Sequence, residues 1–194
     1  MRVRSLFAVA ALALAPVAAF AAPKTYTLDP GHTQVMFSWN HFGFSNPTAN
    51  FNTVKGTLVY DAADPAKSHV QVTMPMSSLD THVPALDEHL KGADFFNAAK
   101  YPDVTFKSTK VIPEGDQKLK VIGNLTAHGV THPVTLQVTL NKMGMHPMMK
   151  VPAIGFDATA TLERKDFGVG AYVPMVSNQI KVRITVEADA KGAK

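Results

Sequence analysis

The sequence has no cysteine, and this absence removes several kinds of site at once. Without thiols the chain can form no disulfide, thiolate zinc site or iron–sulfur cluster, and it has no cysteine nucleophile. It also lacks a Gly-x-Ser-x-Gly elbow, a phosphate-binding P-loop and a His-Glu-x-x-His pair. No block of Lys and Arg is longer than two residues, which argues against a nucleic-acid partner. We therefore expect neither an enzyme nor a nucleic-acid-binding protein.

Long apolar runs are also scarce, and the one at the N-terminus, residues 6–15, is short. A membrane anchor is the alternative interpretation, but a bilayer span needs about 20 apolar residues. The run follows Arg2 and Arg4 and precedes Ala19-Phe20-Ala21, a pattern typical of a cleavable secretory signal peptide. We predict a signal peptide over residues 1–21 and one domain over residues 22–194, exported to the bacterial periplasm. Loss of both arginines leaves 17 Lys and Arg against 15 Asp and Glu, a formal charge of +2.

The remaining chain alternates apolar and polar residues with period two, which is typical of β-strands. The alternation predicts eight strands, over residues 34–41, 56–60, 70–76, 104–111, 118–125, 134–140, 154–162 and 180–186. Segments rich in Gly, Pro and Asp separate them. Pro84 and Gly92 bound one short helix, and residues 94–100 form a looser helical turn. Eight antiparallel strands with short turns can form either a two-sheet sandwich or a closed barrel.

The composition of the strands favours an all-β, eight-stranded antiparallel barrel over a sandwich. Trp39, nine Phe and six or more Met need a place in the interior. Yet Ala158 and Ala160 stand where Val or Ile would fill a sandwich core. Small residues opposite large aromatics leave room, and an eight-stranded barrel can hold one small ligand.

One methionine-rich turn suggests an alternative function. Met143, Met145, His146, Met148 and Met149 lie close together in the sequence. Thioethers with one imidazole suit Cu(I), so a periplasmic copper-binding protein is the alternative hypothesis. The simpler interpretation is a flexible hairpin tip whose methionines cover a barrel mouth.

Several sequence blocks resemble a known family. They are residues 26–29 (Tyr-Thr-Leu-Asp) with His32, Val35, Phe37, His41 and Gly43; residues 90–96; residues 100–108; residues 123–126, 129–131 and 133–136; residues 164–168; and Glu187-Ala188. Together and in this order, the blocks resemble the YceI-like family of lipid- or polyisoprenoid-binding periplasmic proteins. The resemblance implies a lipocalin-like barrel with a long apolar pore. It also implies an elongated amphiphilic ligand such as an isoprenoid quinone, a polyprenyl phosphate or a fatty amide, with neither catalysis nor a covalent cofactor.

On this reading the inward side of each strand lines a lipid site. The predicted lining residues are Val35, Phe37, Trp39, Leu58, Val72, Met74, Phe106, Leu136, Val138, Phe156, Ala158, Ala160 and Ile184, with Phe95, Phe96 and Phe167 closing one end. The head-group candidates are His41, Asp94 and Arg164. Arg164 either pairs locally with Asp166 or points into the barrel mouth towards an anionic head group.

The expected partner is therefore a hydrophobic small molecule. Two further partners are compatible with this hypothesis: a membrane redox protein that receives the cargo, and a second copy of the chain in a homodimer.

Overall fold

The structure, a computed structural model, describes residues 22–190, so the predicted signal peptide over residues 1–21 lies outside the described residues. The described chain forms eleven β-strands and one α-helix. The strands are β1 (Lys24–Leu28), β2 (Gln34–Ser38), β3 (Thr48–Phe51), β4 (Lys55–Tyr60), β5 (His69–Pro75), β6 (Leu79–Asp80), β7 (Asp103–Pro113), β8 (Lys118–Ala127), β9 (Val130–Met145), β10 (Pro152–Glu163) and β11 (Gln179–Asp189), and the helix is α1 (Pro84–Lys91).

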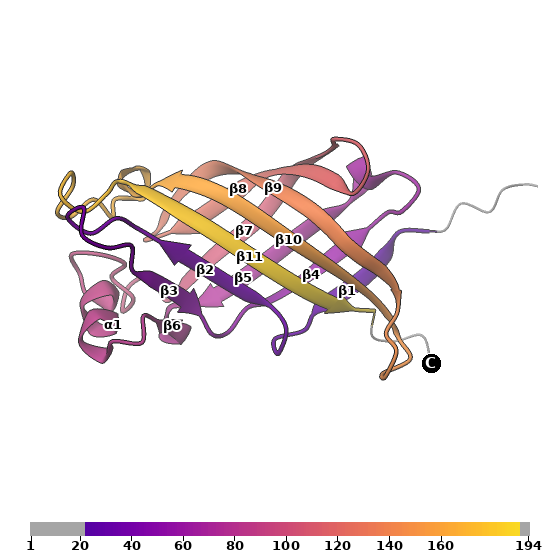
Figure 1. The fold of residues 1–194 in the computed structure, drawn as a ribbon, viewed down its shortest axis with the longest axis horizontal. Helices are drawn as coiled ribbons and strands as arrows, with labels where there is room; N and C mark the ends of the chain where they lie inside the picture. Colours follow the sequence, from indigo (N-terminus) through magenta and orange to yellow (C-terminus); the bar gives the residue numbers. More distant parts are fainter. Residues whose placement is uncertain (1–21, 191–194) are drawn as a thin grey trace, which may run out of the picture.

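The strands form one antiparallel sheet that closes on itself as a barrel (Figure 1). The order is β1-β4-β5-β7-β8-β9-β10-β11-β2-β3-β6, and a β1–β11 pairing completes the circle. Near its C-terminal end β11 pairs with β1 (Thr27 opposite Asp189), and nearer its start it pairs with β2 (Lys181 opposite Ser38). The next strands continue this arrangement. On one side β1 pairs with β4 and β4 with β5, and on the other β2 pairs with β3 and β3 with β6. Each of three barrel positions is thus shared by two short strands, which we call a split strand: β1 with β2, β4 with β3, and β5 with β6. The other five strands fill one position each, so the eleven strands make the predicted eight-stranded barrel.

All eight predicted strands are present, whereas β1, β3 and β6 were not predicted from the sequence. These three have only five, four and two residues, too short for period-two alternation to be distinctive. The helix predicted after Pro84 is confirmed as α1, and it ends where the Gly92 N–H bonds to the His89 carbonyl. Residues 94–100 form turns. No helix within residues 22–190 is long and apolar enough to cross a membrane.

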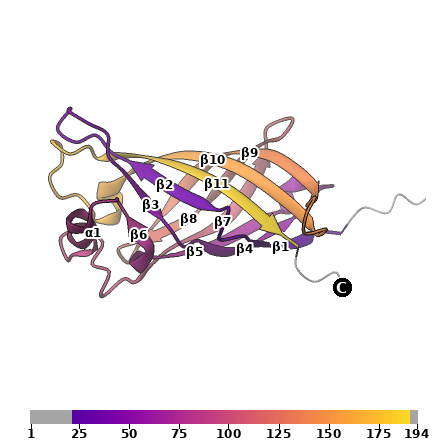
Figure 2. The ribbon, with the colours of Figure 1, turned by 60° about the horizontal axis from the view of Figure 1, so that its bottom comes forward.

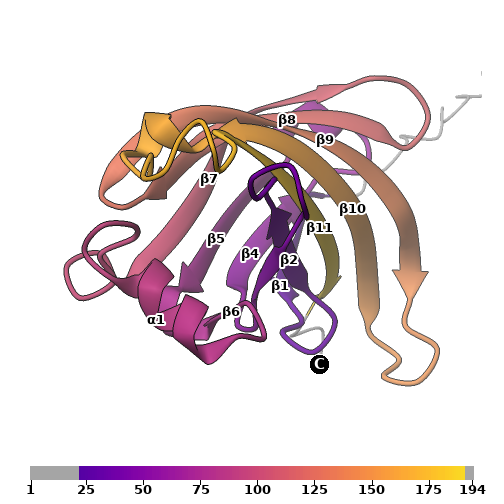
Figure 3. The same cartoon turned by 60° about the vertical axis from the view of Figure 1, so that its left-hand side comes forward.

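The two ends of the barrel differ (Figures 1 and 2). One end carries α1 and the loops on either side of it, together with the loop between β10 and β11. The other end carries the hairpin between β9 and β10 and the C-terminal end of β11. Figure 3 brings the α1 end forward and shows the strands curving round behind it as the barrel wall.

Gly123 on β8 illustrates how large and small residues share the interior. A Cβ atom at this position would lie 2.4 Å from the Phe106 ring on the neighbouring strand β7. The ring therefore packs directly over the glycine backbone. The inner surface of the barrel is therefore uneven, with bulky rings on some strands and small residues such as Ala158 and Ala160 on β10.

Candidate ligand cavity

A cavity of about 530 Å³ runs inside the barrel, within the range typical of small-molecule sites. Its wall contains every residue predicted to line it: Val35, Phe37, Trp39, Leu58, Val72, Met74, Phe95, Phe96, Phe106, Leu136, Val138, Phe156, Ala158, Ala160, Phe167 and Ile184. The alternation phase taken from the sequence thus places these side chains on the inner face of the sheet. A slip of one residue would have placed the strand residues outside.

The cavity wall also contains residues that were not predicted from the sequence. Leu119, Val121, Leu125, Leu162 and Val182 share an alternation phase with predicted lining residues on the same or neighbouring strands, so the signal for them was present. Val111 could not be found in this way, because a bulge between Ser108 and Lys110 shifts the phase of β7 between Phe106 and Val111. Leu28 and Phe51 were missed because they lie on the short strands β1 and β3. Leu86 and Leu90 of α1 and Val169 of the β10–β11 loop reach the cavity only through tertiary packing.

The cavity opens mainly at the α1 end. Five wall residues are solvent-exposed: His41, Phe42, His69, His89 and Tyr172. Four of them lie on the loops and helix of the α1 end, and only His69 lies elsewhere, at the start of β5. Tyr172 lies near α1 and its following turn, with ring centroids 6.3 Å from His89 and 6.1 Å from Phe95. We call this opening the mouth.

Polar groups along the deeper wall are few and bonded to the protein itself. The Thr33 hydroxyl donates to the Glu187 carbonyl at 3.2 Å, and the Ser68 hydroxyl accepts from the Asp61 N–H at 3.0 Å. The Tyr60 ring packs edge-on against Phe156 at 5.8 Å, and burial raises the pKa of its hydroxyl. The Thr33 and Ser68 hydroxyls are already bonded within the protein, so the interior offers a ligand mainly apolar contact.

Arg164 is a buried cation in the wall at the α1 end, only 8% exposed. Its Nε donates to the Ser177 carbonyl at 2.8 Å, Nη1 to Val169 at 2.6 Å, and Nη2 to Ala171 at 2.8 Å and Val176 at 3.0 Å. No ion pair to Arg164 forms within residues 22–190, so the local pairing with Asp166 that the sequence left open is not found. Desolvation by burial lowers the pKa of the guanidinium. Its four backbone bonds hold the β10–β11 loop in shape.

The other two head-group candidates have different positions. His41 lies on the cavity wall, and its ring packs edge-on against Phe42 with centroids 4.6 Å apart. Asp94 is exposed and is not part of the wall, although its neighbours Phe95 and Phe96 are. The structure thus does not place this head-group candidate on the cavity wall: the turn after α1 puts the two aromatic side chains there and leaves the Asp94 carboxylate exposed.

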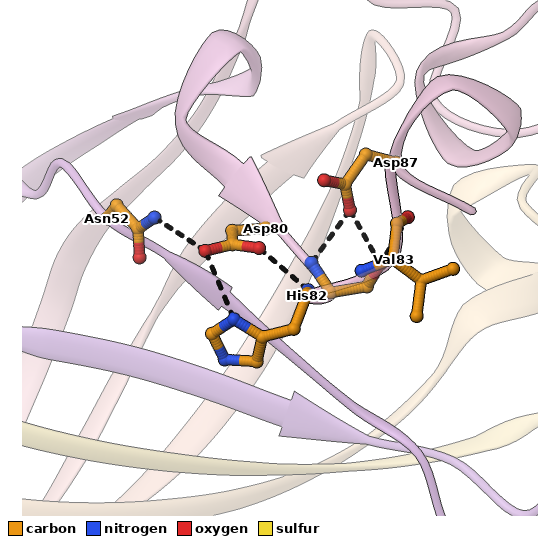
Figure 4. Close-up of polar contacts among 6 residues, drawn as sticks. Asn52, Asp80, His82, Val83 and Asp87 are labelled. Carbon is orange, nitrogen blue, oxygen red and sulfur yellow. Dashed lines mark hydrogen bonds and ion pairs between the residues drawn. The ribbon is translucent and has the colours of Figure 1, made fainter. Parts of the chain in front are cut away.

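Helix α1 is held at the mouth by a polar network at its N-terminal side (Figure 4). One carboxylate oxygen of Asp87 accepts the Thr81 N–H at 2.7 Å and the Thr81 hydroxyl at 2.6 Å. Asp80 accepts the Asn52 amide at 2.9 Å and the His82 N–H at 2.7 Å. These two bonds hold the pKa of Asp80 below its ordinary value. The network ties α1 to β3 and β6, so that Leu86, His89 and Leu90 of α1 meet the cavity.

The methionine-rich turn forms the β9–β10 hairpin, away from the mouth (Figure 1). Met143, Met145, Met148 and Met149 are all exposed, and because this hairpin lies at the end opposite α1 they do not cover the mouth. The His146 Nδ1 accepts the N–H groups of Met148 and Met149, and Nε2 lies 3.4 Å from Glu187 Oε1. Within the described residues, no group of three or more His, Asp and Glu side chains could hold a metal ion. Cu(I) binding by this hairpin stays a prediction.

A closed antiparallel barrel around an apolar cavity that opens mainly at one end defines the class as a lipocalin-like barrel. The match to known sequences then identifies the family: the chain belongs to the YceI-like family, whose domain model matches residues 26–188. A relative called Protein YceI from Salmonella arizonae is 36% identical over 181 residues, covering 93% of this chain and 94% of the relative.

Two solved structures have the same fold. The Campylobacter jejuni YceI protein superposes with a TM-score of 0.72 at 30% identity, covering 79% of this chain and 90% of that one. A polyisoprenoid binding domain from Saccharophagus degradans superposes with a TM-score of 0.67 at 15% identity, covering 85% of this chain and 98% of that one. At 15% identity, the likeness to the Saccharophagus degradans domain concerns the fold alone.

Proposed function

We propose that this protein is a non-enzymatic carrier or reservoir for an elongated amphiphilic lipid in the periplasm, exported by a signal peptide over residues 1–21. The observation that carries the proposal is the 530 Å³ cavity, whose wall is built from aliphatic and aromatic side chains along the barrel. The Saccharophagus degradans domain of the same fold is described as polyisoprenoid binding, which supports a ligand of this class.

The chemistry of the wall favours a long hydrocarbon with one polar end. A linear isoprenoid has little to hydrogen-bond, so its affinity comes from apolar surface removed from water, about 0.8 kcal/mol per buried CH₂. Ordering the tail and associating the two molecules cost ~4–15 kcal/mol, which a pre-formed cavity reduces. An isoprenoid quinone, a polyprenyl phosphate and a fatty amide all meet this description.

The polar end of the ligand belongs at the mouth. Arg164 is a cation without a carboxylate partner among the described residues, and four of its five N–H groups are used by carbonyls. The remaining N–H, together with the imidazoles of His41 and His89, is suited to an electronegative head group such as a phosphate or a quinone carbonyl. The deeper wall has no comparable cation.

The substitution Ala160→Trp tests the proposal, because it adds a large ring to the wall of the cavity. We expect the variant to fold and to lose co-purified lipid, measured by native mass spectrometry and by solvent extraction of protein from the native periplasm. The matched control is Thr161→Trp, the next residue of β10, which is exposed and outside the wall. Unchanged lipid occupancy in Ala160→Trp, or a cavity that takes up no lipid in the unsubstituted protein, would contradict the proposal.

A further inference from the structure

Four large apolar side chains are exposed around the mouth. Phe42 is 46% exposed, Phe44 92%, Tyr172 54% and Met175 57%. They lie on two loops, residues 39–47 and residues 168–177, which Figure 3 shows side by side at the near end of the barrel. We call these four residues the collar. Single exposed apolar residues are ordinary, but several together around one opening mark an interaction surface.

The collar is rigidly built. The Phe42 N–H donates to the Met175 carbonyl at 3.0 Å, and the Ser177 N–H donates to the Asn40 carbonyl at 3.0 Å, so the two loops are joined by their backbones. Within the first loop, the Asn40 side-chain oxygen accepts the Gly43 N–H at 2.8 Å. Within the second, the Arg164 guanidinium bonds four carbonyls, as described above. The exposed side chains therefore do not result from a loose chain end.

Two collar residues also have an unfavourable backbone conformation. Phe42 has φ +53° and Tyr172 has φ +63°, the left-handed region that bulky residues rarely adopt. Such conformations persist where the surrounding structure imposes them, and they concentrate at ligand sites. In both residues the conformation accompanies a ring that is half in the cavity wall and half in solvent.

The charge of the collar loops indicates what they contact. Residues 39–47 and 168–177 contain no Asp, Glu, Lys or Arg, whereas 18% of the whole chain is charged and nineteen average residues would hold about three. Two uncharged loops do not suit a nucleic acid or a strongly charged protein surface. Aromatic side chains without charge suit the interfacial region of a lipid bilayer, where the apolar rings enter and polar tips stay hydrated.

We infer that the collar docks this protein on a bilayer surface with the mouth facing the lipid. This inference rests on the proposed function, because it names the membrane as the place where the cavity is filled and emptied. Phe42 and Tyr172 belong both to the collar and to the cavity wall, so the apolar surface is continuous from the membrane into the barrel. A lipid tail can then pass between bilayer and cavity with little exposure to water.

The test is flotation of the mature chain with phosphatidylcholine vesicles, comparing Phe44→Ser with Met148→Ser. Phe44 is 92% exposed and outside the cavity wall, so its loss threatens neither the fold nor the cavity. We expect Phe44→Ser to reduce the partition coefficient about tenfold, as expected for one aromatic side chain leaving an apolar environment. Met148, 85% exposed on the hairpin away from the mouth, is the matched control and should change little. Added salt should not weaken binding, since no charges are involved.

Several outcomes would overturn the inference. These are no vesicle association of the unsubstituted chain, an equal effect of the two variants, or association abolished by salt. A dimer seen by sedimentation and removed by Phe44→Ser would assign the collar to a second copy of the chain instead. The proposed function is judged separately: Phe44→Ser should keep its co-purified lipid, whereas failure of the carrier proposal would appear as lipid retained by Ala160→Trp.

Discussion

Arg164 shows how much one buried side chain organises in this protein. The sequence places it at a strand end beside Asp166, but the structure directs its guanidinium to four carbonyls of residues 169–177. A planar fork with five donors can satisfy carbonyls in several directions, which a lysine ammonium on a flexible stem cannot do equally well. The residue therefore shapes the loop that carries Tyr172 and Met175 of the collar, in addition to any contact with a ligand.

The substitution Arg164→Lys should destabilise the protein because it keeps the charge and loses most of these bonds. We expect a loss of about 2–3 kcal/mol in the free energy of unfolding, since hydrogen bonds to charged groups contribute about 1.5–3 kcal/mol each. In a domain of this size that lowers the thermal midpoint by roughly 5–10 °C. The control is Arg183→Lys, the other arginine of residues 22–190, which is exposed on β11. Equal midpoints for the two variants would show that the Arg164 bonds contribute nothing.

At the scale of elements, α1 is the part of the wall that depends most on a few polar contacts. It is eight residues long, shorter than an isolated helix needs to be stable in water. Its buried residue is Leu90, and its link to the sheet is the bond of Asp87 to Thr81, beside Asp80 and Asn52 (Figure 4). An element at the mouth with so few anchors is the natural place for local opening.

Removing the Asp87 carboxylate should loosen the helix without unfolding the barrel. In Asp87→Ala the Thr81 N–H and hydroxyl lose their shared acceptor. We expect hydrogen-exchange protection of the amides of residues 84–91 to fall about tenfold, which corresponds to about 1.4 kcal/mol. Glu88→Ala is the matched control, because it removes a neighbouring carboxylate that is exposed. Asp→Ala gains more helix propensity than Glu→Ala, so propensity alone would protect the helix in Asp87→Ala and opposes the expected fall. Protection that falls equally in both variants would contradict the role of the Asp87 bonds.

At the scale of the whole molecule, the cavity replaces what would otherwise be a packed core. Interiors are normally filled to high density, and an empty apolar space loses contacts on every side. A ligand that binds the folded barrel and not the unfolded chain restores those contacts and stabilises the fold. For the carrier function proposed above, stability and occupancy are therefore linked.

Lipid loading should raise the thermal midpoint of the protein. With free lipid at about 100 times its dissociation constant, the gain is about 2.7 kcal/mol, or roughly 5–10 °C for this length of chain. Differential scanning fluorimetry of delipidated, refolded protein with and without added polyprenyl phosphate measures it. The Ala160→Trp variant, whose cavity is filled by its own ring, should show no such shift. A midpoint that does not respond to lipid in the unsubstituted protein would argue against a cavity that binds this ligand.

The sequence alone determined eight of the eleven strands and, for the residues predicted to line the cavity, which side faces inward, because period-two alternation is a local property of each segment. Hence the alternation by itself puts Val35, Phe106 and Ala160 on the inner face, where they line the cavity. The tertiary structure decided the closure through β1 and β11, the split strands, the exposed position of Asp94 and the partners of Arg164. These features depend on which distant residues meet, or on the path of a turn, and neither leaves a periodic trace in the sequence. The collar is the clearest case, since Phe42 and Met175 are far apart in the chain and become neighbours only when the barrel closes.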